Sequence, residues 1–160
     1  MHDEHRGRPG MSPLSARLAA IVDALPLRPG IRVLEIGGGP GAAARAVAGR
    51  IGDGHVVMID RSGRSVDLAR RNSRAEIDAG LMSVRRVAIE EFELAAGEAP
   101  FDLAFAVRVG ALDGRHPAAG RVALARIAAA LTPRGQLFVD GGTPLRALRL
   151  PPDTRRAPDR

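Results

Sequence analysis

The chain lacks several residue types, each of which would supply a particular chemistry. It contains no cysteine among its 160 residues, which excludes disulfides, thiolate nucleophiles and zinc–thiolate sites. It also contains no lysine, tyrosine or tryptophan, and only four phenylalanines. Any reaction must therefore depend on a bound ligand or on oxygen and nitrogen side chains.

The same absences limit the partners that we expect. The formal net charge is +6 and every basic side chain that contributes to it is arginine, a charge that favours contact with nucleic acid. However, RNA and single-stranded nucleic acids stack on aromatic side chains, which are scarce here. We therefore interpret the arginines as solvated charges scattered over the surface. No apolar run approaches the roughly 20 residues that cross a bilayer, and residues 1–6 lack the apolar core of a signal peptide. We expect a cytoplasmic protein that binds neither nucleic acid nor a membrane.

Composition along the chain predicts one folded domain between two polar ends. With 45% hydrophobic and 26% charged residues, the composition is that of an ordinary globular protein. Residues 1–11 are polar and rich in glycine and proline, so we expect a flexible tail and predict no metal site from His2 and His5. Residues 12–143 are expected to form the domain, and the proline- and arginine-rich residues 144–160 a C-terminal tail.

Residues 31–41, with the sequence IRVLEIGGGPG, are the most informative stretch. An apolar run breaks into glycines and then into the alanine-rich residues 42–48, which is typical of a strand, a tight turn and a helix. Glycines let a ligand lie against bare backbone, and Pro40 suits the first helical position, where free amides attract a carboxylate or phosphate. An ordinary glycine-rich turn is one interpretation, and two ligand fingerprints also fit. These are Gly37-x-Gly39-x-x-Ala42 for a dinucleotide and Glu35-x-Gly37-x-Gly39-x-Gly41 for S-adenosylmethionine.

Four further apolar runs alternate with helical patterns. Helices are expected from Ser12-Pro13, from Pro40, from Ser62 and from Pro117. The alternation predicts a parallel sheet with right-handed crossovers. An acid at the tip of the second strand, Asp60, would face the ribose hydroxyls of a ligand, or would cap the next helix. The expected strands after the first are residues 55–60, 82–89, 101–107 and 136–140.

Four sequence pieces occur in the order and at the spacing of one known family. They are VLEIGGGPG at 33–41, IDRS at 59–62 with LARRN at 68–72, FDL at 101–103, and LTPRGQL at 131–137. On these pieces the chain resembles the class I S-adenosylmethionine-dependent methyltransferases over residues 14–143. The resemblance implies a doubly wound, Rossmann-like parallel sheet of about five strands in the order 3-2-1-4-5, with helices on both faces.

The resemblance also implies how the cofactor S-adenosylmethionine would be bound. Glu35 and the glycine loop would hold its methionine part, Asp60 its ribose hydroxyls, and Arg61 would lie beside the adenine. Residues after the third strand would line the adenine pocket, and those at the end of the fourth strand would lie under the sulfonium, with Arg108 facing the acceptor. The predicted cofactor-binding residues are Glu35, Gly37, Gly38, Gly39, Gly41, Asp60, Arg61, Ala88, Ile89, Glu90, Ala106 and Val107.

Two departures from the family pattern affect these expectations. Many members carry an acid at the position of Ala88 that bonds the adenine amino group, so Glu90 or a backbone carbonyl would have to replace it. The usual sixth and seventh strands find no room after residue 143, which would leave the fifth strand as an exposed edge. Because exposed edges are normally covered or paired, we expect a homodimer through that edge.

The predicted function is S-adenosylmethionine-dependent methyl transfer to an unidentified small-molecule acceptor. This reaction has a neutral leaving group, so the protein must mainly align the reactants and exclude water. Asp113 and His116 follow the fourth strand and are candidate bases, but solvated loop positions are the favoured interpretation, and no catalytic residue is predicted. The alternatives are a non-catalytic module that binds S-adenosylmethionine or S-adenosylhomocysteine, and an NAD-binding oxidoreductase, which normally needs a second mononucleotide half.

Overall fold

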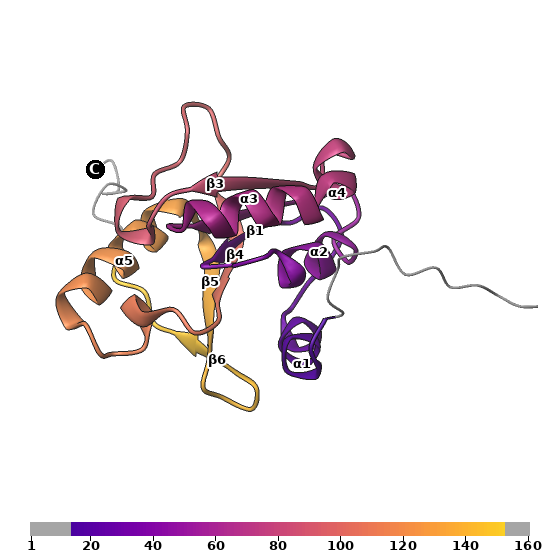
Figure 1. Ribbon diagram of the computed structural model, residues 1–160. Helices are drawn as coiled ribbons and strands as arrows, with labels where there is room; N and C mark the ends of the chain where they lie inside the picture. The colour runs from indigo at the N-terminus through magenta and orange to yellow at the C-terminus, as the bar shows by residue number, and fades with distance from the viewer. Residues whose placement is uncertain (1–13, 153–160) are drawn as a thin grey trace, which may run out of the picture.

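One sheet organises the residues that this computed structural model describes, 14–152 (Figure 1). The strands are β1 (Arg32–Ile36), β2 (His55–Asp60), β3 (Met82–Arg86), β4 (Phe101–Ala106), β5 (Leu131–Asp140) and β6 (Leu145–Leu148). Their order is β3-β2-β1-β4-β5-β6, with the first five parallel and β6 antiparallel to β5. The helices are α1 (Ala16–Ala24), α2 (Ala42–Ala48), α3 (Gly63–Asn72), α4 (Arg74–Asp78) and α5 (Pro117–Ala130), with short 3-10 turns η1 (Ile89–Glu91) and η2 (Gly110–Leu112). The predicted doubly wound order 3-2-1-4-5 is confirmed.

Side chains alternate along the central strands and build an apolar core on each face of the sheet. On β1, Val33 packs into a cluster with residues of α1, α2 and α3, whereas Leu34 packs into a second cluster with residues of α5 and η1. On β2, Val56 and Val57 divide in the same way. Both faces are covered by helices, which is why these strands carry apolar side chains at consecutive positions. Among residues 14–152, no helix is long and apolar enough to cross a membrane.

The carboxyl ends of β1, β2 and β4 lie at one edge of the sheet. Ile36 pairs with Ile59 on one side and with Ala106 on the other. The three loops that follow these strands therefore meet at the carboxyl end of β1. At this point the strand order changes direction, because β2 lies on one side of β1 and β4 on the other. In open parallel sheets this is where ligands bind, so the topology places the glycine loop at the expected site.

The prediction that the sheet lacks a sixth strand is wrong. β6 pairs with β5 from Leu137 opposite Leu148 to Asp140 opposite Leu145, so β5 is covered along this segment. The reversal depends on Gly141, with φ +98°, and on Gly142, where a Cβ would collide with the Leu145 carbonyl. The exposed β5 edge that motivated a homodimer is therefore absent along this segment, and the folded part extends past the predicted boundary at residue 143.

Several element ends differ from the predicted ones. The α1 cap is Ser15, whose hydroxyl accepts the Leu18 amide hydrogen bond at 3.2 Å, while the predicted cap at Ser12 and residues 1–11 lie outside the described residues. Pro40 does not open α2, because Gly41 takes a left-handed φ of +88° and the helix begins at Ala42, two residues after Pro40. The third strand ends at residue 86 rather than 89. The predicted Ser62 cap of α3 and Pro117 start of α5 are confirmed.

Candidate functional site

The loop between β1 and α2 brings bare backbone to the carboxyl edge of the sheet. Gly37 and Gly39 have φ values of +68° and +57°, and a Cβ on Gly38 would collide with the Met58 side chain. The Gly37 amide donates to the Ile59 carbonyl at 2.8 Å, which holds the loop against β2. The local need for glycine is therefore steric at Gly38 and conformational at its two neighbours.

Asp60 fixes the end of the glycine loop relative to the end of β2. Its Oδ2 accepts a hydrogen bond from the Gly39 amide at 3.0 Å, and its Oδ1 accepts one from the Ser62 amide at 2.8 Å. Ser62, rather than Asp60, supplies the side-chain cap of α3, accepting the Ser65 amide hydrogen bond at 3.2 Å. Each carboxylate oxygen has a second lone pair, so Asp60 can still accept hydrogen bonds from a ligand.

Glu35 is a carboxyl group buried beneath the glycine loop. It lies on β1 and is 5% exposed, and among the described residues its Oε2 has no hydrogen-bond partner. Burial, followed by the nearby charge of Asp60, raises its pKa from 4.5 to about 8, and Arg45 opposes the shift. Glu35 is therefore mostly protonated at neutral pH, and a cation that reached Oε2 would favour its ionised form.

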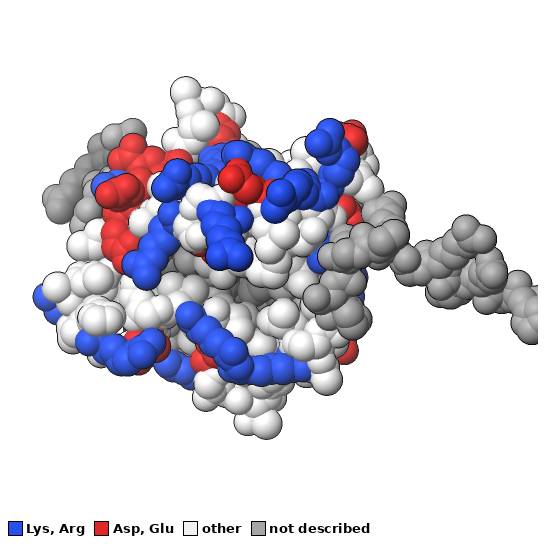
Figure 2. All heavy atoms as spheres, viewed as in Figure 1, with Lys and Arg blue, Asp and Glu red and all other residues white. Residues whose placement is uncertain are grey.

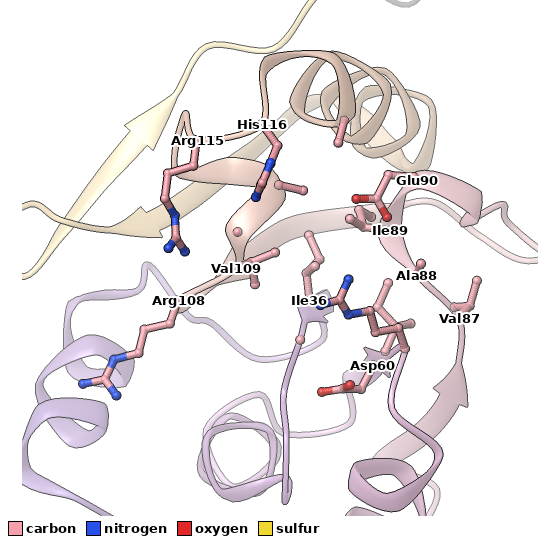
Figure 3. A pocket seen from close by; sticks show the side chains of 16 residues that line it. Ile36, Asp60, Val87, Ala88, Ile89, Glu90, Arg108, Val109, Arg115 and His116 are labelled. Carbon is pink, nitrogen blue, oxygen red and sulfur yellow. The ribbon is translucent and has the colours of Figure 1, made fainter.

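Two cavities lie on either side of the glycine loop. The larger, of about 670 Å³, lies beside Asp60 and is seen from close by in Figure 3. The smaller, of about 260 Å³, lies against Glu35 and α1. Gly37 and Arg108 line both cavities, so the two form adjoining parts of one site. The larger volume falls within the range of roughly 300–1,000 Å³ that small-molecule sites occupy.

Most of the predicted binding residues line one of these cavities. Gly41 and Ala106 line neither, because Gly41 caps α2 and Ala106 is 1% exposed within the core. The larger cavity is lined by Gly37, Asp60, Arg61, Ala88, Ile89 and Glu90 among the predicted residues. The smaller is lined by Glu35, Gly37, Gly38, Gly39 and Val107.

The loop after β4 contributes residues that the motifs did not predict, among them Val109 and Arg115. Of the two candidate bases, His116 lines the larger cavity, whereas Asp113 does not. The pKa of Asp113 lies below its ordinary value because its carboxylate accepts hydrogen bonds from the Arg115 backbone and side chain. An acid that holds its charge in an ion pair is a poor general base, which leaves His116 as the better placed of the two.

The second unpredicted contribution comes from α1. Arg17 lines the smaller cavity and pairs with Asp140 at 2.8 Å, a residue at the end of β5. The other oxygen of Asp140 accepts the Arg108 amide hydrogen bond at 3.0 Å. Asp140 thus joins α1 to the loop that follows β4. No local sequence signal indicates this contact, since 123 residues separate Arg17 from Asp140.

Comparison with known proteins identifies the family. Residues 33–135, more than half of the chain, match the model of a methyltransferase domain. The protein-L-isoaspartate O-methyltransferase of Methanothrix thermoacetophila is 45% identical over 56 residues, which are 34% of this chain and 27% of that protein.

Solved structures share the fold. An S-adenosylmethionine-dependent methyltransferase from Thiobacillus denitrificans, in complex with S-adenosylhomocysteine, superposes with a TM-score of 0.62 at 24% identity, over 80% of this chain and 49% of that one. Phosphoethanolamine N-methyltransferase 2 of Haemonchus contortus, in complex with S-adenosylmethionine, superposes with a TM-score of 0.61 at 26% identity, over 77% of this chain and 27% of that one. The chain thus spans between about a quarter and a half of these relatives' lengths. With the family model extending from β1 into β5, across the glycine loop and Asp60, the chain belongs to the class I S-adenosylmethionine-dependent methyltransferase family.

Proposed function

We propose that the chain binds S-adenosylmethionine across the two cavities and transfers its methyl group to a small-molecule acceptor. The observation that carries this proposal is the buried Glu35, whose Oε2 has no partner among the described residues and which lines the smaller cavity. A buried carboxyl with an unsatisfied oxygen is costly, and the ammonium group of a methionine moiety would satisfy it. Arg17 and Arg108 line the same cavity and suit the carboxylate of that moiety.

The larger cavity fits the adenosine part of the cofactor. Asp60 retains acceptor capacity for two ribose hydroxyls, and its position is fixed by the Gly39 amide. Apolar side chains, including Ile36 and Ile89, line the cavity and suit a flat ring system. Glu90 also lines this cavity, and its side chain points into it in Figure 3. Its carboxylate would bond the adenine amino group in place of the acid that is missing at Ala88.

Bound S-adenosylmethionine supplies an electrophilic methyl group on a sulfonium whose departure leaves a neutral thioether. The contribution of this chain is then to hold the two reactants in line and to exclude water. The hydrogen bonds of the glycine loop and the Asp140 contacts to Arg17 and Arg108 fix the backbone around the site. His116 is within the larger cavity and can take a proton from an acceptor that loses one early.

Transfer of radiolabelled methyl groups to a panel of small acceptors tests the proposal. Label is expected in a product only when an acceptor is present, and Asp60→Ala should weaken S-adenosylmethionine binding by about 1–3 kcal/mol. An unchanged affinity in this variant would show that Asp60 only braces the loop.

A module that binds the cofactor without turnover is the second candidate, because the residues that line the two cavities suit the cofactor whereas no catalytic residue is predicted. Cofactor binding with no label in any acceptor would support that candidate over the first. Pairing of two copies of the chain through the sheet edge at β5 remains a proposal, although β6 covers residues 137–140 of that strand, and light scattering of the concentrated protein would test it.

A further inference from the structure

The two arginines that line the smaller cavity are held by the same acid. Arg17 comes from α1 and Arg108 from the loop after β4. Asp140, at the end of β5, bonds both of them but itself lines neither cavity. In the space-filling view, arginine side chains border the hollow in this face of the molecule on two sides (Figure 2), so charge alone does not set these two apart from the others.

Asp140 holds Arg108 by its backbone. The φ of Arg108 is +57°, a left-handed value that is costly for a residue with a Cβ and that persists where the surroundings enforce it. The Asp140 Oδ1 accepts the Arg108 amide hydrogen bond at 3.0 Å, which favours this conformation. In Figure 3 the Arg108 side chain points away from Arg115 and toward α1, the helix that carries Arg17.

Asp140 holds Arg17 by its side chain. The Asp140 Oδ2 accepts a hydrogen bond from the Arg17 Nη2 at 2.8 Å, which leaves other N–H groups of the same guanidinium for a ligand. The Arg17 side chain is 47% exposed, and an ion pair with this much exposure contributes little to stability. Its main effect is to fix one conformation of a long, flexible side chain, which a ligand would otherwise have to order on binding.

We propose that Asp140 is a positioning residue that makes the smaller cavity selective for a cofactor with a free carboxylate. Because Asp140 orders Arg17 and Arg108 beforehand, the carboxylate meets donors that are already in place. Repulsion between Asp140 and that carboxylate opposes this effect but is weaker, since Asp140 is paired with Arg17 and solvent reaches both side chains. The inference rests on the proposed function, in which this cavity holds the methionine part of S-adenosylmethionine.

Calorimetric titration with S-adenosylmethionine and with decarboxylated S-adenosylmethionine tests the inference. The two ligands share the adenosine, the sulfonium and the amine, and they differ only in the carboxylate. The wild-type protein should bind S-adenosylmethionine roughly tenfold more tightly than the decarboxylated ligand. Asp140→Ala should remove most of this preference. Asp140→Asn should keep part of it, because the amide oxygen can still accept the Arg108 amide hydrogen bond. Neither variant should change the affinity for the decarboxylated ligand.

Asp23→Asn is the matched control, because Asp23 also lies on α1 and pairs with Arg50 at 2.6 Å, while neither residue lines the two cavities. It should leave both affinities unchanged. Tighter binding of S-adenosylmethionine by Asp140→Asn would show that Asp140 only competes for Arg17, and equal losses for both ligands would show that it only supports the fold. Either result would overturn the inference, as would equal affinities of the wild-type protein for the two ligands.

These results would leave cofactor binding standing, since each is measured on a protein that binds S-adenosylmethionine. Failure of the wild-type protein to bind S-adenosylmethionine would instead remove the proposed function itself.

Discussion

Replacing Glu35 by Gln should stabilise the ligand-free protein by an amount that grows with pH. The carboxyl of Glu35 is 5% exposed, and its pKa is raised from 4.5 to about 8, mainly by burial and next by Asp60. In the unfolded chain the same group ionises at its ordinary pKa. Between these two values the unfolded state releases a proton that the folded state retains, so rising pH favours unfolding.

The size of this effect follows from the two pKa values. No penalty exists well below pH 4.5; it grows as the pH rises from 4.5 to about 8 and levels off above that. At roughly 1.4 kcal/mol for each pKa unit, the contribution of Glu35 to the free energy of unfolding falls by about 3 kcal/mol between pH 5 and pH 8. The Gln variant cannot ionise, so its stability relative to wild type should rise by this amount over the same interval.

Urea unfolding of both proteins at several pH values between 5 and 8 measures the difference. Any destabilisation by the buried amide itself is the same at every pH, so it does not affect how the stability difference changes with pH. Glu91→Gln, at an exposed position in η1, is the matched control and should track wild type at every pH. Parallel stability curves for wild type and Glu35→Gln would show that Glu35 is already ionised in the folded protein, which would refute the reasoning.

Two further predictions concern packing and acid sensitivity. Gly38→Ala should lower the free energy of unfolding by about 1–3 kcal/mol, because the added Cβ would collide with the Met58 side chain. Gly49→Ala is the control, since a Cβ there meets only ordinary contacts, and thermal unfolding of both variants compares them. Glu98 has its pKa lowered chiefly by the hydrogen bond from Arg85, so its stabilisation is present at neutral pH and is lost as the pH falls below 4.5. Glu98→Gln should therefore cost about 1 kcal/mol at pH 7 and progressively less as the pH falls below 4.5, and a cost that does not change with pH would contradict this.

The sequence predicted the central part of the fold because the signals there are local. Along residues 55–60 every side chain except the first and last is buried, so the run reads as a strand without knowledge of its neighbours. Ser62 and Pro117 similarly mark helix starts by their own chemistry. The strand of residues 145–148 could not be found in this way. It has two exposed residues and two half-buried ones, and it exists because β5 offers it a partner across a glycine turn.

The candidate site likewise combines residues that local sequence signals predict with residues that only the fold brings together. The glycine loop and Asp60 are readable from spacing, since strand ends and tight turns are local features. Arg17 and Arg115 carry no motif, and only folding brings them to the cavities beside Arg108. Asp140 was expected at the end of a strand, but its two partners are 123 and 32 residues away. Tertiary ion pairs of this kind leave no periodic pattern in a single sequence.

Calorimetric titration with S-adenosylhomocysteine at pH 7, in two buffers of different ionisation enthalpy, tests the central claim most directly. Glu35 is mostly protonated in the ligand-free protein, with a pKa of about 8, and must ionise to meet the ligand's ammonium group. The account predicts one bound ligand per chain with release of nearly one proton, and no such release in Glu35→Gln. Absence of binding, or binding with the same proton release in both proteins, would contradict it.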